Sequence, residues 1–262
     1  MKDILQTIAD NKRREIEVLY QNDQRPLYLN PEKLWLKPVF SMSQSIREKN
    51  GGIIAEFKRR SPSKGEIAPM ADVAKIIPEY VSGGAAACSV LTDTRFFGGS
   101  SADLAVAQTL AEETPLLRKD FIISKVQIAE ARALGASAIL LIASILSKEE
   151  LAEFHNYAHQ YRMETLVEIH GLEELDKLSF SPDMLGVNNR NLSTFHTDLS
   201  HSFHLVKSLP HDTVLVAESG IKSARDIKRL RDAGFQGFLI GEAFMSTKEP
   251  GKTLQNFIEN SY

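Results

Sequence analysis

The chain has 262 residues, a formal net charge of -3 and one cysteine. This length fits a single α/β barrel and buries a sizeable core without a disulfide or a metal ion. The near balance of 31 basic and 34 acidic residues disfavours binding to nucleic acid or to a membrane surface.

Three features of the sequence indicate a cytoplasmic protein. Charged residues return early, at Asp10 and Lys12, so we expect no secretory signal peptide. The longest aliphatic run, residues 138–143, is far shorter than the ~20 residues of a membrane-spanning helix. Cys88 lies in a small apolar run that predicts a buried strand, and a lone cysteine fits a reducing compartment.

The first 50 residues are predicted to form a helical extension that packs on the rest of the chain. Helical patterns cover residues 4–20 and 43–48, and the stretch between them contains Pro26, Pro31 and Pro38. Within the first pattern, the charged run 12–15 predicts a solvated helix face. No linker marks a second domain, so we expect residues 1–262 to form one domain with residues 1–50 as its extension.

Eight short apolar runs follow, each succeeded by polar residues and a helical pattern. Their continuous apolar character is typical of parallel strands buried on both faces. The predicted strands are residues 52–57, 86–91, 115–117, 137–142, 165–169, 184–188, 213–217 and 237–240.

The spacing of these runs predicts a (β/α)8 TIM barrel. Capping boxes at Ser147 and Ser223 indicate helix starts, while Gly135 and Gly234 indicate helix ends. An open doubly wound sheet is the alternative. Eight strand–helix units and the absence of a first-strand G-x-G-x-x-G fingerprint favour the closed barrel.

Ionisable and amide residues stand directly after most of the predicted strands. Any one of Lys58, Lys119 or Glu168 is readily explained as an exposed charge at a strand end. Because the carboxyl ends of barrel strands meet at one rim, their convergence instead indicates a site that combines acid, base and anion recognition.

The last two strands carry a candidate phosphate site. Ser219-Gly220 and Gly241-Glu242 place small residues beside helix starts, where backbone N–H groups bind anions, although tight turns are an equally good explanation of these glycines taken alone. We expect the Glu242 side chain to point away from the anion. A bulky residue at 241 is expected to raise KM more than it lowers kcat.

A pair of histidines one helical turn apart, His155 and His159, is a weaker candidate for a site. The segment lacks the glutamate of the H-E-x-x-H zinc motif, and it falls within a predicted outer helix. Both residues are therefore predicted to be surface residues, and we expect no metal ligands in the chain.

Residues 53–63, with the sequence IIAEFKRRSPS, resemble the first-strand signature of the indole-3-glycerol phosphate synthase family. The resemblance continues in family order over essentially the whole chain. The further motifs are 91–93 (LTD), 97–100 (FGGS), 117–121 (LRKDF), 166–170 (LVEIH), 186–192 (GVNNRNL), 216–221 (VAESGI) and 239–242 (LIGE).

This resemblance implies a carboxy-lyase of tryptophan biosynthesis. Its substrate would be 1-(2-carboxyphenylamino)-1-deoxyribulose 5-phosphate, converted to indole-3-glycerol phosphate with loss of CO2 and water. Neither a metal nor an organic cofactor is implied. We expect a monomer whose partner is the phosphorylated substrate, with other tryptophan-pathway enzymes as candidate protein partners.

By resemblance, Lys119 is the leading general acid, and a buried lysine near other cations would have a lowered pKa. Glu168 and Lys58 would serve the later dehydration, with Glu56 and Asn188 orienting them. The family's division of acid and base has more than one version, and the sequence does not choose between them. The implied substrate-binding residues are Ser61, Phe97, Phe121, Arg190, Glu218, Ser219, Gly220, Leu239, Gly241 and Glu242.

Two other functions remain as alternatives. A phosphoribosylanthranilate isomerase would share the phosphate site, but it needs a Cys and Asp pair, and Cys88 lies inside a predicted strand. A catalytically inert barrel that binds a phosphometabolite or a protein would have the same fold. The presence of both acidic and basic groups at the rim argues against an inert binder.

Overall fold

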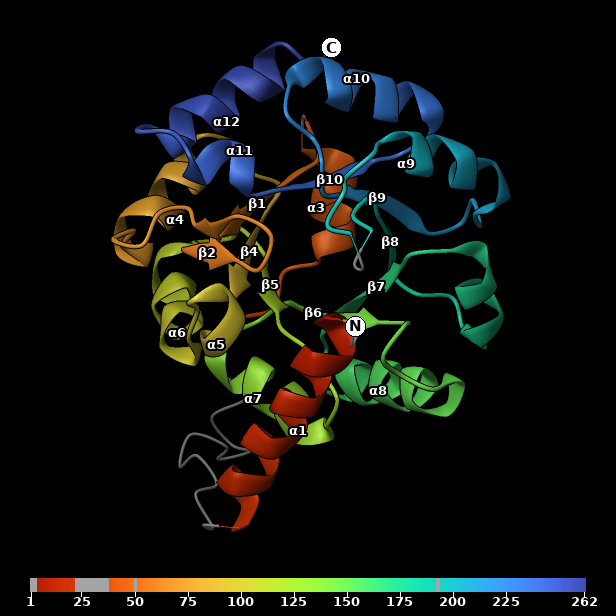
Figure 1. Cartoon of the computed structure of the whole chain (residues 1–262). Coiled ribbons are helices and arrows are strands. Elements are labelled where there is room, and N and C mark those ends of the chain that lie inside the picture. Colours follow the sequence, from red (N-terminus) through yellow and green to blue (C-terminus); the bar gives the residue numbers. More distant parts are fainter. Residues whose placement is uncertain (1–3, 22–37, 50, 192–193) are drawn as a thin grey trace.

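The computed structural model describes residues 4–21, 38–49, 51–191 and 194–262. Parallel strands close into a barrel in the order β1-β10-β9-β8-β7-β6-β5-β4, with β4 paired to β1 (Figure 1). The predicted (β/α)8 TIM barrel is confirmed. The barrel strands are β1 (Ile53–Phe57), β4 (Ala87–Leu91), β5 (Leu116–Lys119), β6 (Ala138–Ile142), β7 (Glu164–Ile169), β8 (Met184–Asn188), β9 (Val214–Glu218) and β10 (Gly237–Ile240).

Helices surround the barrel, and their ends follow local sequence signals. Ser147 and Ser223 form the predicted capping boxes with Glu150 and Asp226, and Gly135 ends its helix in the left-handed conformation. The helices are α4 (Val73–Ser82), α5 (Thr94–Phe97), α6 (Ser101–Leu110), α7 (Lys125–Leu134), α8 (Lys148–Gln160), α9 (Ser200–Leu205), α10 (Ala224–Ala233), α11 (Glu242–Met245) and α12 (Pro250–Glu259), with 3-10 turns η1 (Leu172–Lys177) and η2 (Val206–Ser208).

Two apolar layers hold the barrel together. One lies between the strands and the surrounding helices, and it includes Ile53, Ile139 and Leu141. The other fills the barrel interior with alternate residues of the same strands, such as Ile54 and Leu140. Strands buried on both faces explain why the sequence shows unbroken apolar runs instead of alternation.

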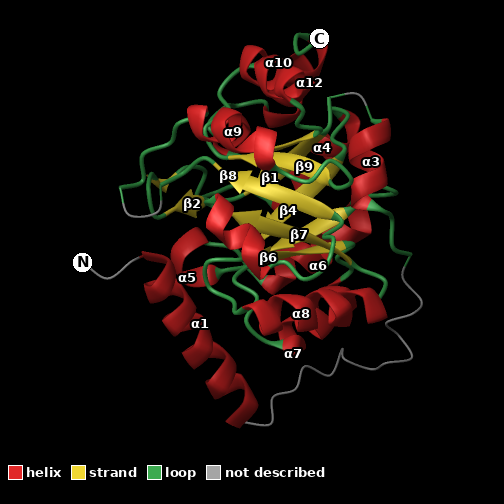
Figure 2. Ribbon diagram, turned by 90° about the vertical axis from the view of Figure 1, so that its right-hand side faces the viewer, coloured by secondary structure: helices red, strands yellow, loops and turns green. Residues whose placement is uncertain are grey.

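The N-terminal extension places one helix at each end of the barrel, α1 (Ile4–Gln21) and α3 (Met42–Glu48) (Figure 2). Met42 and Ile46 of α3 pack into the interior layer from the N-terminal ends of the strands. The Glu164 carboxylate accepts hydrogen bonds from the first backbone N–H groups of α3, at 2.7 and 2.9 Å. A carboxylate at a helix start is stabilising because it neutralises the positive end of the helix dipole.

Pro26, Pro31 and Leu192 lie outside the described residues. A short hairpin, β2 (Arg60–Ser61) with β3 (Gly65–Glu66), follows the first strand and was not predicted. Within the described ranges, no helix has both the length and the apolarity to cross a membrane.

Candidate active site

A cavity of about 770 Å³ opens at the C-terminal ends of the barrel strands. Every residue that the sequence predicted for the site lines it. The lining includes Glu56, Lys58, Ser61, Phe97, Lys119, Phe121, Glu168, Asn188, Arg190, Glu218, Ser219, Gly220, Leu239, Gly241 and Glu242. The barrel closure brings these residues together from the ends of seven strands, β1, β4, β5, β7, β8, β9 and β10.

The first strand contributes an ion pair to the cavity wall. Lys58 donates a hydrogen bond from Nζ to Oε1 of Glu56 at 2.5 Å. The Glu56 side chain is almost fully buried, while that of Lys58 is 14% exposed. The pair therefore places a cation on the cavity surface and holds it with a carboxylate beneath.

Lys119, at the end of β5, lies between two buried carboxylates. Its Nζ is 3.4 Å from Oε2 of Glu168 and 3.4 Å from Oε2 of Glu218. Burial alone would lower the pKa of Lys119, but the charges of Glu218 and Glu168 outweigh burial and raise it. The expected lowering by neighbouring cations is therefore wrong, because carboxylates surround this lysine, and Lys119 is protonated at neutral pH.

The two carboxylates beside Lys119 differ in their affinity for a proton. Burial acts to raise the pKa of Glu168, but Lys119, His170 and a hydrogen bond from Asn188 together lower it. Burial raises the pKa of Glu218 to about 8. The positive charge of Lys119 acts to lower this pKa, whereas the negative charge of Glu168 raises it further. Of this pair, Glu168 therefore ionises first and Glu218 takes up a proton more readily.

A glycine in β8 allows these carboxylates to approach. Gly186 is paired with Glu168 across the sheet, and a Cβ at Gly186 would lie 2.2 Å from Oε1 of Glu218. The carboxylate of Glu218 thus occupies the space that any larger residue at 186 would fill. This requirement is invisible in the sequence because Gly186 and Glu218 lie 32 positions apart (218 − 186).

The far wall of the cavity contains the candidate phosphate loops. Ser219 and Gly220 both have positive φ angles, of 66° and 82°. A serine in this conformation is strained, and such strain persists chiefly at functional positions. Gly241 directly precedes the short helix α11, whose first residue is Glu242.

Glu242 forms ion pairs at the rim of the cavity. Its carboxylate lies 3.2 Å from Nζ of Lys64 and 3.9 Å from the Arg190 guanidinium. Arg190 also donates a hydrogen bond to the Ser63 hydroxyl at 2.6 Å. Glu242 was expected to point away from the bound anion, and in the structure its carboxylate pairs with two cations of the cavity lining.

An aromatic pair forms the apolar end of the cavity. The ring centroids of Phe97 and Phe121 are 6.1 Å apart. Leu5 and Ile8 of α1 also line the cavity, and sequence analysis missed this contribution. Their spacing of three residues marks one face of a helix, but nothing local to α1 shows where that face packs.

Lys12 anchors α1 over the site. Its Nζ lies 3.0 Å from Asp93 and 3.1 Å from Asp120, and the side chain is 7% exposed. The prediction of a solvated face for residues 12–15 is therefore wrong for Lys12, although Arg13 is 53% exposed. Burial would lower the pKa of Lys12, but Asp120 and Asp93 outweigh it and raise that pKa.

Cys88 lies fully buried in β4, as predicted, away from the cavity lining. Burial raises the pKa of its thiol to about 12, so the thiolate is scarce at neutral pH. This environment does not suit the nucleophilic or proton-transfer role that an isomerase would give to the cysteine.

Fold and cavity together define a TIM-barrel protein with paired acids and bases at the catalytic face of the barrel. Residues 5–257 match the family model described as indole-3-glycerol phosphate synthase. The chain is 48% identical to the indole-3-glycerol phosphate synthase of Bacteroides thetaiotaomicron, covering 99% of each chain. It is 41% identical to that of Salinibacter ruber, covering 96% of this chain and 93% of the relative. The chain belongs to the indole-3-glycerol phosphate synthase family.

A solved structure shares the architecture at low identity. Thiamine phosphate pyrophosphorylase from Pyrococcus furiosus superposes with a TM-score of 0.62 and 15% identity. The match covers 84% of this chain and 98% of that structure. This similarity supports the barrel fold alone.

Proposed function

We propose that the chain acts as an indole-3-glycerol phosphate synthase of tryptophan biosynthesis. It would convert 1-(2-carboxyphenylamino)-1-deoxyribulose 5-phosphate to indole-3-glycerol phosphate, CO2 and water. The observation that carries the proposal is the position of Lys119 between Glu168 and Glu218, inside the cavity that the family motifs line.

Ring closure is the first step that the site has to serve. The aryl carbon bearing the carboxylate attacks the ketone carbon, and Lys119 donates a proton to the ketone oxygen as it becomes a hydroxyl. The raised pKa of Lys119 keeps this donor charged at neutral pH and stabilises the developing negative charge. Loss of CO2 then returns the bonding electrons to the ring and restores aromaticity.

Dehydration completes the indole. A base removes the proton from the ring nitrogen while an acid protonates the departing hydroxyl, which leaves as water. A proton of the methylene carbon beside the nitrogen then moves to the nitrogen, so that the carbon–carbon double bond of the indole forms and the N–H is restored. We assign the base to Glu168, whose lowered pKa keeps it ionised, and the acid to Lys58. Glu56 positions Lys58 through their 2.5 Å hydrogen bond, and Asn188 orients Glu168.

Substrate recognition is divided between the two ends of the cavity. Phe97 and Phe121 would enclose the anthranilate ring, whose flat apolar faces suit an aromatic wall. Ser219, Gly220 and Gly241 would bind the phosphate through backbone N–H groups. Glu218 and Leu239, at the strand ends that precede these loops, would also contact the substrate. Ser61, Arg190 and Glu242 would contact the substrate from the rim.

The proposed chemistry requires neither a metal ion nor an organic cofactor, since side chains supply its acids and its base. We also propose that residues 1–262 form one domain that acts as a cytoplasmic monomer. The lone buried cysteine is in keeping with a reducing compartment. Size-exclusion chromatography with light scattering tests the oligomeric state, and the same experiment with other tryptophan-pathway enzymes tests for partners.

One assay tests the proposed activity. Purified protein is mixed with synthetic 1-(2-carboxyphenylamino)-1-deoxyribulose 5-phosphate, and the fluorescence of the indole product is followed. Product formation that Lys119→Met abolishes supports the proposal. Binding without turnover would instead indicate the inert barrel, and isomerisation of phosphoribosylanthranilate would indicate the isomerase.

A further inference from the structure

We propose that His155, His159 and Asp183 form a binding site for a divalent ion of the zinc class, at the opposite end of the barrel from the cavity. Both histidines lie on α8, and Asp183 directly precedes β8. Their candidate ligand atoms all lie within 4.8 Å of one another. The prediction that both histidines are surface residues is wrong for His155, which is only 8% exposed.

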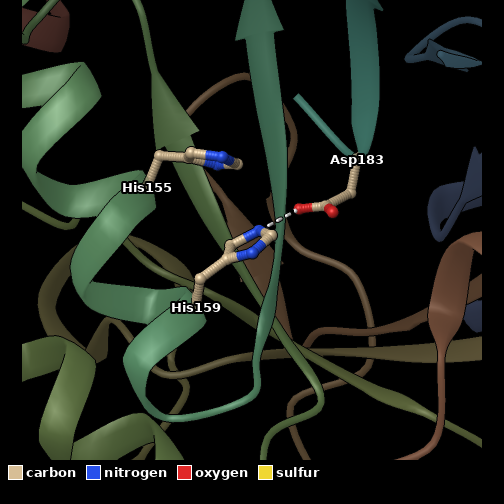
Figure 3. A group of neighbouring side chains, drawn as sticks. All are labelled: His155, His159 and Asp183. Carbon is tan, nitrogen blue, oxygen red and sulfur yellow. Dashed lines mark hydrogen bonds and ion pairs between the residues drawn. The ribbon is translucent and has the colours of Figure 1, made fainter. Parts of the chain in front are cut away.

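The spacing of the three side chains suits a small metal ion. His155 and His159 stand one helical turn apart, with ring centroids separated by 4.2 Å, and Asp183 faces them from the neighbouring loop (Figure 3). The His159 Nε2 lies 2.9 Å from Oδ2 of Asp183. Two ligand atoms on one tetrahedral zinc ion are separated by about 3.3 Å, as bonds of about 2.0 Å require. Ligand atoms that lie within 4.8 Å of one another would therefore have to approach by at most about 1.5 Å to bind the ion.

A hydrogen-bond chain prepares His155 to act as a ligand. Its Nδ1 lies 2.8 Å from the Thr165 hydroxyl, and that hydroxyl donates to Oδ2 of Asp183 at 3.2 Å. Because Thr165 uses its proton toward Asp183, its oxygen accepts from Nδ1–H of His155. This arrangement leaves the Nε2 lone pair for the metal, and such outer partners are typical of metal-binding histidines.

Packing against Phe180 also fixes the orientation of the His155 ring. Phe180 stacks against the ring, with centroids 4.2 Å apart and an interplanar angle of 18°. Two imidazoles and one carboxylate form a donor set that zinc prefers, with the fourth position left for water.

The ion would act as a clamp on the fold. It would tie α8 to the start of β8, and Thr165 links the same cluster to β7. Thr165 and Glu168 lie at opposite ends of β7, about 10 Å apart at 3.3 Å per residue. Binding is therefore expected to raise thermal stability and to leave turnover unchanged, so its failure would not affect the proposed activity.

The test measures the melting temperature of the full-length protein with and without Zn²⁺ after removal of metals by a chelator. At a Zn²⁺ concentration of about a hundred times Kd, we expect the melting temperature to rise by roughly 5 °C. Isothermal titration should give one ion per chain. Co²⁺, used as a spectroscopic substitute, should show visible absorption typical of tetrahedral coordination.

His159→Gln is the decisive variant. Glutamine keeps a donor for Asp183 but removes an imidazole ligand, and the exposed position of His159 protects the fold. His211→Gln is the matched control, because His211 is exposed and lies in the loop before β9 at the same end of the barrel. The Zn²⁺ effect should disappear in His159→Gln and persist in His211→Gln. An absent shift in the native protein, or an equal shift in His159→Gln, would overturn the proposal.

Discussion

The backbone of Gly241 lies against the side chain of Glu56, so closely that a Cβ at position 241 would be 2.5 Å from Oε1. Gly241 is a proposed phosphate-binding residue, and Glu56 positions the proposed acid Lys58. The absence of a side chain at 241 thus serves the phosphate loop and the catalytic ion pair together. From the sequence, a phosphate site and a tight turn explained this glycine equally well, and neither explanation involved Glu56.

Gly241→Ala is therefore expected to impair turnover as well as binding. The added methyl group displaces Glu56 and with it Lys58, and a displacement of about 1 Å costs roughly a hundredfold in rate. We expect kcat to fall and KM to rise, instead of the change mainly in KM that the sequence suggested. Steady-state kinetics separate the two effects.

Gly234→Ala is a suitable control for this variant. Gly234 ends α10 with a φ of 120°, and the nearest atom to an added Cβ is 3.7 Å away. Alanine at Gly234 strains the backbone because φ is positive there, so this variant controls for a general loss of stability without a contact to Glu56. Unchanged kcat in Gly241→Ala would show that Glu56 does not need its present position.

Lys119→Met is expected to reduce kcat by about 10²- to 10⁴-fold, the usual cost of losing a general acid. KM should change little, since the phosphate loops and the aromatic pair remain. The exposed Lys248→Met provides a control for the loss of one positive charge. A near-normal kcat in a folded Lys119→Met protein would remove Lys119 from the mechanism.

Local patterns predicted the barrel and the composition of its cavity. The strands appear as apolar runs because both of their faces are buried, and the site residues follow those runs directly. Contacts between distant segments were not predictable in this way. Lys12 looked solvated because its partners, Asp93 and Asp120, lie more than 80 positions away in the chain. The pKa of Lys119 was misjudged for the same reason, since its neighbours come from other strands.

Glu218 should make the stability of the protein depend on pH. Its pKa is about 8 in the folded chain, against an ordinary value of 4.5. Between these values the folded state binds the proton and the unfolded state does not, so this group stabilises the fold fully below pH 4.5 and loses its contribution as pH rises toward 8. The loss is at most about 1.4 kcal/mol per pH unit.

Glu218→Gln isolates this effect, because glutamine has no proton to lose. The melting temperature of the variant, relative to the native protein, should increase from pH 5 to pH 8 and then level off. Thermal unfolding followed by circular dichroism at each pH measures the difference. A difference that stays constant over this range would mean that Glu218 is already ionised in the folded chain.

Lys12→Met should lower the free energy of unfolding more than a substitution at an exposed helix position does. Its removal leaves Asp93 and Asp120 buried with one cation fewer, and breaking a buried pair from one side costs about 3 kcal/mol. Loosening α1 also withdraws Leu5 and Ile8 from the cavity wall, so KM should rise. Denaturant unfolding and kinetics test both effects. Arg13→Met, one residue away and largely exposed, should be near neutral, and equal effects of the two changes would contradict the anchoring role of Lys12.

Exhaustive chelation with EDTA followed by dialysis should leave kcat unchanged. The proposed acids and base are the side chains of Lys119, Lys58 and Glu168, so the reaction itself needs no ion. The proposed zinc clamp lies at the other end of β7, and its loss should lower the melting temperature without slowing the reaction. The fluorescence assay before and after dialysis, run well below the melting temperature, measures the first effect. If activity falls with EDTA and a divalent ion restores it in the His159→Gln variant as well, the metal acts in the cavity and the proposed mechanism is wrong.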